Sequence, residues 1–409
     1  MKNTPMFQLI ASFLTMVMIG NLQYTWTVFV EPMRGAHSSW QLSQVQLGAT
    51  IYIALQTWVQ PLNGWVIDKI GQRPFITVAG LLVGVGWSLI GTATALWELY
   101  IYYGIAAVGA AFVYSGAMGS AQKWFPYRRG FASGVSAAGY GGGSALFVFI
   151  NSHLIGAYGY QKAFLFTGIL QGVVIIVVAQ VLQHPRKDFN PPKPAASAKV
   201  NKSRHGTQDW STPEMLRTPI FYILYFMFVC MGIGGIFLAT GVGSLAKTWQ
   251  LTAILTTAQA LGLVANALSR PFWGWVSDRK GRENTMVVAF FLQALALVAL
   301  VRFGQTSAVL FTITVICAYF TWGEIYALFP STIGDYFGSK NATSNNAFLY
   351  SAKGVSGLLG IYVPALLFEK LGSWTAVLYI SAGLALLASL VAIVIRTRPL
   401  PKKAGMVVA

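Results

Sequence analysis

Long apolar segments recur along almost the whole chain, and each has close to the ~20 residues that an α-helix needs to cross a bilayer. Polar residues gather in short stretches between them. The pattern predicts twelve membrane-spanning helices, six before and six after one longer polar stretch. The predicted spans are 7–30, 43–67, 75–94, 97–122, 130–156, 161–183, 219–246, 252–277, 285–305, 308–334, 343–368 and 373–396.

The longer polar stretch, 184–218, is rich in proline and lysine and is too polar to pack as a core. It divides the chain into an N-terminal six-helix bundle (1–183), a linker (184–218), a C-terminal six-helix bundle (219–397) and a short tail (398–409). We therefore expect an all-α polytopic membrane protein made of two pseudo-symmetric six-helix bundles, with an uncleaved first span.

Composition agrees with this interpretation. Of the 409 residues, 55% are hydrophobic and only 10% are charged, whereas a soluble protein has about 25% charged residues. So few charges cannot cover a soluble surface, which excludes a soluble enzyme. No large polar domain remains, which excludes a single-span receptor. The two cysteines lie inside apolar runs and indicate no disulfide framework.

The net charge of +17 is distributed unevenly along the chain. If both termini are cytoplasmic, the cytoplasmic segments hold 21 of the 28 lysines and arginines. The opposite side holds five, and two lie within spans. This bias predicts that the protein lies in an inner membrane with both termini, the linker and the tail in the cytoplasm. The basic surplus then faces anionic lipid and does not indicate nucleic-acid binding.

A motif is repeated at matching positions in the two halves. The segment GWVIDKIG (64–71) after the second span matches GWVSDRKG (274–281) after the eighth, and a proline precedes each copy by three residues. The motif resembles the loop signature of the major facilitator superfamily. That resemblance implies the two-bundle fold and a gating role for the charged motif residues, while the alternative is a plain solvated turn. The implied gating residues are Asp68, Lys69, Arg73, Asp278 and Arg279.

The two cations inside spans, Arg270 and Lys353, are the strongest functional signal. An intramembrane cation costs at least ~2.5–3.5 kcal/mol and marks a ligand or ion pathway by default. Arg270 has an alternative, because its side chain could extend to the interface from about 12 Å inside the membrane, at 1.5 Å per residue from Asp278. Two buried cations without two obvious buried acids predict an anionic ligand.

Polar and aromatic residues in other spans are candidates for the walls of an anion site. Tyrosine hydroxyls donate to carboxylates, and rings exclude water. The alternative for any single ring is lipid or interfacial contact, because 14% of the chain is aromatic. The candidates are Gln23, Tyr24, Trp26, Tyr114, Tyr140, Trp322 and Tyr326.

Several segments are similar to the oxalate:formate antiporter family over essentially all of the chain. They include QYTW (23–26), AGYG (138–141), RPFWG (270–274), FTWG (320–323) and AK (352–353). The resemblance implies that Arg270 and Lys353 bind the two carboxylates of oxalate. It also implies that the rings Tyr24, Tyr114, Tyr140, Trp322 and Tyr326 enclose the anion.

Glu324 departs from this pattern, since we expect a small residue there. It lies two residues from both Trp322 and Tyr326, about 200° around the helix, and is expected to face a neighbouring span in a structural role. Two alternatives stay open. Glu324 could neutralise a cavity cation and favour a monoanion, or it could carry a coupled proton.

These observations predict a secondary active transporter of small carboxylates that works by alternating access and exchanges oxalate for formate. The alternative is a proton-coupled monocarboxylate transporter for lactate, pyruvate or formate. A channel is a competing class, but it needs a continuous polar pore. No nucleophile–base set, metal-ligand spacing or nucleotide-binding loop is visible, so we expect no enzyme, metal or cofactor. The expected partners are the anions and the lipid bilayer, with a monomer as the unit.

Overall fold

The computed structural model of the chain describes residues 4–125, 129–183, 208–338 and 341–398, together with 185 and 400. These residues are mostly helical, and the described part of the chain contains no strand, so the expected all-α fold is confirmed. The elements are α1 (Pro5–Tyr24), α2 (Trp26–Ala36), α3 (Leu42–Trp58), α4 (Gln60–Ile70), α5 (Gln72–Ile90), α6 (Leu96–Trp124), α7 (Arg129–Ala179), α8 (Thr212–Leu216), α9 (Pro219–Thr248), α10 (Thr252–Lys280), α11 (Arg282–Phe303), α12 (Ala308–Trp322), α13 (Ile325–Phe337), α14 (Ala342–Tyr350), α15 (Ala352–Gly357), a π-helical turn η1 (Leu358–Tyr362), α16 (Val363–Leu371) and α17 (Thr375–Thr397).

Within the described residues, 10 helical stretches are long and apolar enough to cross a membrane. Twelve spans were expected, and the difference has two causes. The spans expected at 130–156 and 161–183 both lie in α7, which bends at Gly159, where φ is +83°. The span expected at 43–67 is interrupted at Val59, which divides it into α3 with 17 residues and α4 with 11, both below the ~20 residues of a typical crossing. If α7 is two crossings and α3 with α4 is one, the twelve expected spans are accounted for.

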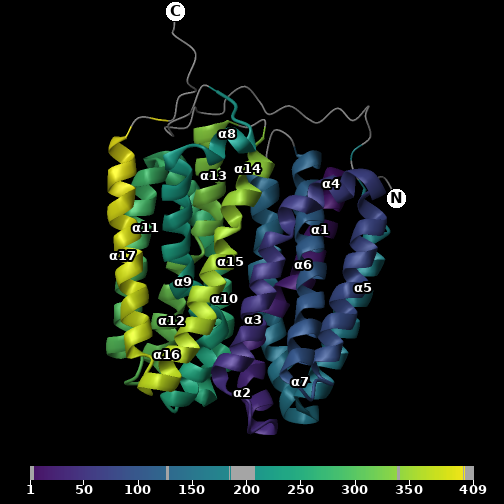
Figure 1. The fold of residues 1–409 in the computed structure, drawn as a ribbon, viewed down its shortest axis with the longest axis vertical. Helices are drawn as coiled ribbons and strands as arrows, with labels where there is room; N and C mark the ends of the chain where they lie inside the picture. The colour runs from purple at the N-terminus through teal and green to yellow at the C-terminus, as the bar shows by residue number, and fades with distance from the viewer. Residues whose placement is uncertain are drawn as a thin grey trace, which may run out of the picture.

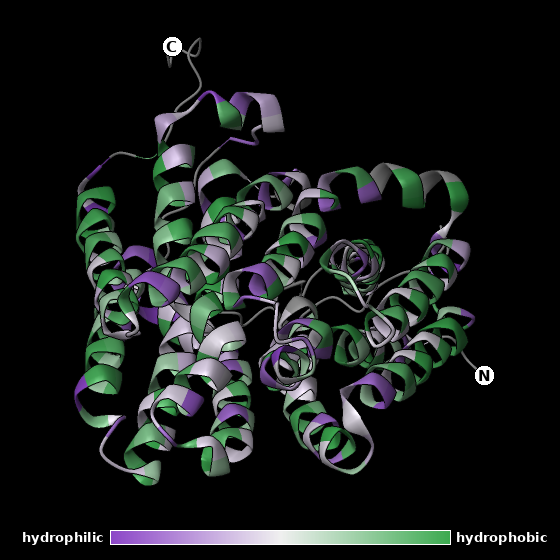
Figure 2. Ribbon diagram, turned by 60° about the horizontal axis from the view of Figure 1, so that its bottom comes forward, coloured by the Kyte–Doolittle hydropathy of each residue, from purple (hydrophilic) through white to green (hydrophobic). Residues whose placement is uncertain are grey.

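The outer surface of the helices is apolar, as a lipid environment requires. Leu146, Val177 and Leu268 lie within spans, yet each is 61% exposed. Figure 2 shows hydrophobic residues along the whole length of the helices. An exposed apolar surface of this extent would promote association in water, whereas it is stable against lipid.

The helices gather in two bundles that lie side by side, as Figure 1 shows. Helices α1 to α7 form the N-terminal bundle, and α9 to α17 form the C-terminal bundle. The main contacts between them are α7 against α10, α3 against α15, and α2 against α9. The short α8 lies at the end where the chain starts and finishes, which we call the terminal end; α2 and α16 lie at the opposite end (Figure 1).

Most of the linker and tail lies outside the described residues. Of the linker expected at 184–218 the structure describes 185 and 208–218, and of the tail expected at 398–409 it describes 398 and 400. The described part of the linker contains α8, which begins with a capping box between Ser211 and Glu214.

The repeated sequence motif is also a repeat of backbone geometry. Gly71 ends α4 with φ +82° and ψ 162°, and Gly281 ends α10 with φ +91° and ψ 152°. Residues with a Cβ rarely adopt this conformation, so the last position of each copy requires glycine. Each glycine reverses the chain directly into the next helix, α5 or α11.

Three spans are interrupted directly after a buried aromatic residue. α1 ends at Tyr24, α12 ends at Trp322 and α14 ends at Tyr350, and in each case a new helix begins within two or three residues. At the first interruption, Asn151 Nδ2 on α7 donates to Thr25 Oγ1 at 2.9 Å. Interrupted helices inside a membrane are tolerated where the backbone faces protein or a cavity. These interruptions therefore mark the region in which a ligand site is expected.

Candidate functional site

Arg270, on α10, lies at the interface between the bundles and is only 5% exposed. Its Nη1 donates to the carbonyl oxygen of Ala137 on α7 at 2.7 Å, and its Nη2 donates to Asn266 Oδ1 at 3.1 Å. The guanidinium carbon lies 4.7 Å from the centre of the Tyr326 ring, within the range of a cation–π contact. Arg270 therefore points into the protein and not towards the lipid interface.

Lys353, on α15, is fully buried at the same interface. Its Nζ donates to Gln23 Oε1 at 2.8 Å, to Gln56 Oε1 at 3.1 Å and to the Tyr350 hydroxyl at 3.3 Å. Gln23 and Gln56 belong to α1 and α3 of the other bundle. In the described part of the chain, amide, carbonyl and hydroxyl oxygens surround both cations, and no carboxylate pairs with either of them.

Six aromatic rings form a connected enclosure around these two cations. Tyr24 makes edge contacts with Tyr140 and Trp322, with ring centres 5.6 and 6.2 Å apart. Neighbouring rings continue at 5.5 to 6.2 Å, and the Lys353 ammonium lies 5.4 Å from the Tyr140 and Tyr350 rings. The enclosure consists of Tyr24, Tyr114, Tyr140, Trp322, Tyr326 and Tyr350.

Several buried N–H donors around the enclosure have no acceptor among the residues that the structure describes. They are Arg270 Nε, Trp322 Nε1, Gln23 Nε2 and Gln56 Nε2. A buried donor without an acceptor costs free energy, and such groups call for an explanation. Two cations and four available donors inside walls of aromatic rings favour a small ligand that carries negative charge and acceptor oxygens.

Close packing of α9 against α12 fixes one wall of the enclosure. A Cβ at Gly235 would lie 2.0 Å from the Trp322 ring, so only glycine lets this ring lie against α9. A Cβ at Gly323 would lie 2.0 Å from Ser269 Oγ on α10. Glycine at these positions therefore determines where the Trp322 ring stands relative to Arg270.

Of the residues predicted from the sequence, the structure brings together Arg270, Lys353 and the five aromatic residues implied by the family resemblance, with Gln23 beside them. It does not bring Trp26 to this group. Trp26 stacks on Tyr103 with ring centres 4.5 Å apart, and its Nε1 donates to Gln46 Oε1 at 3.1 Å. Trp26 thus packs within the N-terminal bundle, because it stands two residues beyond Tyr24 and past the helix break at Thr25.

Sequence reasoning missed three polar members of the site: Gln56, Asn266 and Tyr350. Asn266 precedes Arg270 by four residues and Tyr350 precedes Lys353 by three. Asn266 therefore occupies the same face of α10 as Arg270, and Tyr350 lies about one turn before Lys353, across the break at Ser351. A polar residue three or four positions before an intramembrane cation could therefore have been predicted to contact it. Gln56 gave no comparable signal, since only the packing of α3 against α15 brings it to Lys353.

Glu324 is fully buried between α12 and α13. Neither of its carboxylate oxygens meets a hydrogen-bond donor in the described part of the chain, and it makes no contact with Arg270 or Lys353 that would neutralise them. Thr321, one helical turn earlier on the same face, donates to Gln293 on α11. Glu324 therefore lies at the break between α12 and α13, one turn beyond the residue that contacts α11.

The predicted gating residues lie near the terminal end. Asp278 pairs with Arg282 at 2.7 Å, and Arg282 also pairs with Asp335 at 2.9 Å, so these ion pairs join α10, α11 and α13 within one bundle. The Arg279 guanidinium lies 3.9 Å from the centre of the Trp275 ring, and Arg73 is exposed. The side chains of Asp68 and Lys69 lie outside the described residues.

The sequence matches the family description "Major Facilitator Superfamily" over residues 9–323 and 242–406. It is 33% identical over 397 residues to the oxalate:formate antiporter of Oxalobacter formigenes, which covers 97% of this chain and 91% of that protein. It is 25% identical over 357 residues to monocarboxylate transporter 12 of Rattus norvegicus (80% of this chain, 72% of that protein). It is 22% identical over 400 residues to apicoplast pyruvate carrier 1 of Toxoplasma gondii (83% of this chain, 71% of that protein).

Proposed function

Because the chain belongs to the major facilitator superfamily and is a membrane transporter, we propose that its cargo is a small carboxylate anion and that it exchanges oxalate for formate. The observation that carries the proposal is the pair of buried cations, Arg270 and Lys353, inside one aromatic enclosure without a carboxylate partner in the described part of the chain. A dianion with a carboxylate at each end matches this pair in charge.

The roles follow from the chemistry of the two cations. Arg270 carries a planar fork that suits bidentate binding of one carboxylate. Lys353 carries a compact ammonium with three donors and takes the second carboxylate. The aromatic rings exclude water and limit the size of the ligand. The 33% identity to an oxalate:formate antiporter over 97% of the chain supports the same assignment.

The mechanism is alternating access of the site between the two bundles, with the terminal end facing the cytoplasm of a cell with an inner membrane. The distribution of lysine and arginine supports this orientation. At the opposite end, cross-bundle contacts close the path. Gly243 N donates to Thr27 Oγ1 at 2.7 Å, and Gln46 Nε2 donates to the Thr240 carbonyl at 3.0 Å. The single chain holds a complete site, so a monomer is the proposed unit of transport.

Charge balance supplies a physical reason for exchange. Enclosing two uncompensated cations away from water costs several kcal/mol per ion. A bound dianion cancels both charges, so the loaded carrier changes conformation more easily than the carrier without a ligand. Oxalate inward against formate outward then moves one net negative charge into the cell in each cycle.

Counterflow in proteoliposomes tests the proposal. Vesicles loaded with formate should take up radiolabelled oxalate faster than unloaded vesicles, and an imposed membrane potential should change the rate. An exchange rate that does not change with the membrane potential would contradict the exchange of a dianion for a monoanion. Uptake without stimulation by internal anion would contradict exchange.

A second candidate function, proton-coupled transport of a monocarboxylate, is favoured by one observation. Glu324 is a fully buried carboxyl group without a hydrogen-bond partner in the described part of the chain, which suits a group that takes up and releases a proton. The relatives named for monocarboxylates and pyruvate agree with this substrate class. Uptake driven by a pH gradient into vesicles without internal anion would favour this function over exchange.

A further inference from the structure

A second polar site lies at the opposite end of the molecule, where the two bundles meet. A cavity of about 220 Å³ is lined by α2 and α7 of one bundle and by α9 and α10 of the other. Its polar lining includes Thr27, Glu31, Ser152, Lys247, Thr252 and Thr256. Thr256 precedes Arg270 by fourteen residues of α10, which is about 21 Å along a helix. The cavity is therefore distinct from the enclosure around Arg270 and Lys353.

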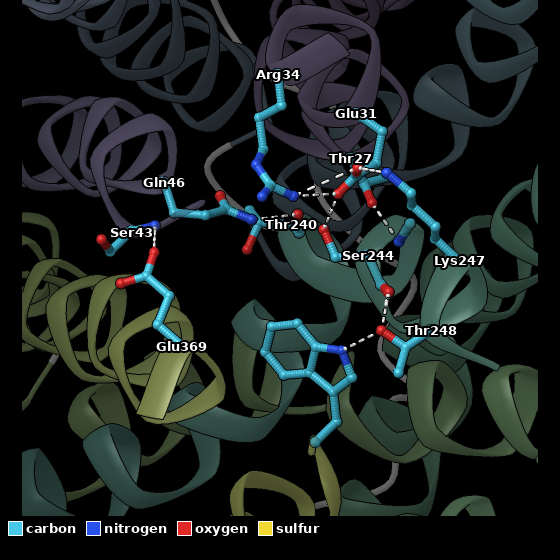
Figure 3. A network of polar contacts seen from close by, with 12 residues as sticks. Thr27, Glu31, Arg34, Ser43, Gln46, Thr240, Ser244, Lys247, Thr248 and Glu369 are labelled. Atoms are coloured by element: carbon cyan, nitrogen blue, oxygen red, sulfur yellow. Dashed lines mark hydrogen bonds and ion pairs between the residues drawn. The ribbon is translucent and has the colours of Figure 1, made fainter. Parts of the chain in front are cut away.

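Glu31 and Lys247 line this cavity, and Arg34 lies beside Glu31 in the same network of polar contacts, as Figure 3 shows. Lys247 Nζ lies 2.5 Å from Glu31 Oε2, and Arg34 Nη1 lies 3.2 Å from Glu31 Oε1. Ser244 donates to Glu31 Oε1 at 3.0 Å. Burial opposes ionisation of Glu31, but the hydrogen bond from Lys247 and the charges of Arg34 and Lys247 lower its pKa overall. The three charged groups together carry one excess positive charge.

Lys247 is the member of this group that is most accessible to an anion in solution. Its side chain is 61% exposed, against 33% for Arg34 and 19% for Glu31. An ion pair with so exposed a partner contributes little to stability, so an external carboxylate competes for the ammonium. Glu31 does not lose all of its partners in that competition, because Arg34 and Ser244 still donate to its other oxygen.

We propose that this cavity is an outer binding site for the transported carboxylate, in which the anion displaces Glu31 from Lys247. The proposal rests on the proposed function for the class of anion, while the site itself is argued from the cavity and its charges. A dianion such as oxalate binds there more strongly than a monoanion such as formate.

Occupation of this outer site also loosens the closed end. Glu31 belongs to α2 and Lys247 to α9, so their ion pair is a contact between the bundles. The neighbouring cross-bundle bonds, from Gly243 to Thr27 and from Ser43 N to Glu369, do not involve Lys247. An arriving anion thus removes one specific contact that holds this end shut, before it reaches Arg270 and Lys353.

The first test measures initial rates of radiolabelled oxalate uptake by cells that express the protein. Glu31→Gln frees Lys247 and should lower the KM for external oxalate about threefold or more, whereas Lys247→Gln should raise it by a similar factor. Formate should respond less to both changes. Glu369→Ala is the matched control, because it removes the acceptor of a cross-bundle hydrogen bond at 2.7 Å without touching Lys247. It should leave KM unchanged.

Opposite shifts in KM separate an anion site from a simple latch. If the pair only held the bundles together, Glu31→Gln and Lys247→Gln would break the same contact and shift KM in the same direction. That result, or no shift in either variant, would overturn the proposal. If the unsubstituted protein transported neither oxalate nor formate, the proposed function would fail instead.

An equilibrium measurement tests the outer site without transport. Lys353→Gln disables the central pair, and calorimetric titration of that purified variant with oxalate should still show one weak site that the added change Lys247→Gln removes. Residual binding that is unaffected by Lys247→Gln, or no residual binding at all, would contradict an outer site at Lys247.

Discussion

Lys353 on α15 donates to Gln23 Oε1 on α1 at 2.8 Å, and Tyr140 on α7 donates to the same oxygen at 2.7 Å. One amide oxygen therefore joins the cation of the C-terminal bundle to two helices of the N-terminal bundle. If Lys353 binds a carboxylate, as proposed above, that carboxylate would compete with this amide. Ligand binding at the cation and the contact between the bundles would then be parts of the same hydrogen-bond exchange.

Removal of either central cation should abolish oxalate exchange. Lys353→Gln and Arg270→Lys should each lower kcat/KM for oxalate by at least about 100-fold, since a carboxylate loses its charged partner or its bidentate fork. Uptake into formate-loaded proteoliposomes measures this. Lys370→Gln, at an exposed position of the opposite end, is the control and should behave as the unsubstituted protein. Normal oxalate exchange by Lys353→Gln would refute the assignment.

Tyr350 should contribute through its hydroxyl as well as its ring. Tyr350→Phe keeps the stacking on Tyr114 at 5.5 Å but loses the oxygen that accepts from Lys353 at 3.3 Å. We expect a decrease of roughly fivefold in oxalate affinity, as for one hydrogen bond. Tyr350→Ala should be more severe because it opens the enclosure. Equal effects of the two substitutions, measured by binding titration, would show that the ring is unimportant.

Because Asn266 is neutral, it should leave the positive charge of Arg270 available to a bound anion. Asn266→Asp would place a carboxylate about 3.1 Å from Nη2 and lower oxalate affinity at neutral pH by about tenfold or more. Protonation makes the new side chain neutral again, so oxalate exchange by the variant should recover as the pH falls. Asn266→Ser is the control and should show no such recovery. A pH profile of Asn266→Asp identical to that of the unsubstituted protein would argue against this role.

Glu324→Gln should preserve the order of substrate preference and the pH profile of exchange, with rates within about twofold. The carboxyl group lies at the break between α12 and α13 and contacts neither cation, and the amide has a similar volume. Competition of oxalate, formate and lactate for labelled uptake measures the order. Loss of pH-driven uptake with intact counterflow would instead identify Glu324 as the carrier of a coupled proton.

Glu31 should stabilise the protein at neutral pH and lose this effect only in acid. The pKa of Glu31 is lowered in the folded state, so its contribution is present above the ordinary carboxyl value of about 4.3 and is lost as the pH falls through the lower folded value. The difference in Tm between the unsubstituted protein and Glu31→Gln should be constant from about pH 8 to 5 and should decrease as the pH falls below the ordinary carboxyl value of about 4.3. A difference that disappears between pH 7 and 6 would contradict the ion pairing.

The sequence predicts the apolar segments and places both cations within them, because apolar length and intramembrane charge are signals that tertiary context rarely overrides. Apolar length predicts a crossing, and a charge within it is costly unless it has a function. The helix breaks after Tyr24, Trp322 and Tyr350 were not predicted, since they depend on tertiary contacts such as the bond from Asn151 to Thr25. Gln56 was missed for the same reason.

The helical spacing that separates Glu324 from the rings of the site applies to Trp26 as well. Glu324 is expected to have a structural role because it lies two residues from the rings of the site, about 200° around its helix. Trp26 stands in the same relation to Tyr24, and the structure places it against Tyr103 within the N-terminal bundle. The helical phase alone would have removed it from the predicted site.

The three helix interruptions divide the aromatic enclosure between segments that approach from different ends of the molecule. Tyr24 and Tyr350 terminate α1 and α14, which start at the terminal end, whereas Trp322 terminates α12, which starts at the opposite end. A ligand that contacts these rings would therefore contact segments that begin at both ends of the molecule. A tilt of any one segment at its break would change the shape of the enclosure that the others also line, so the enclosure can respond to movement at either end.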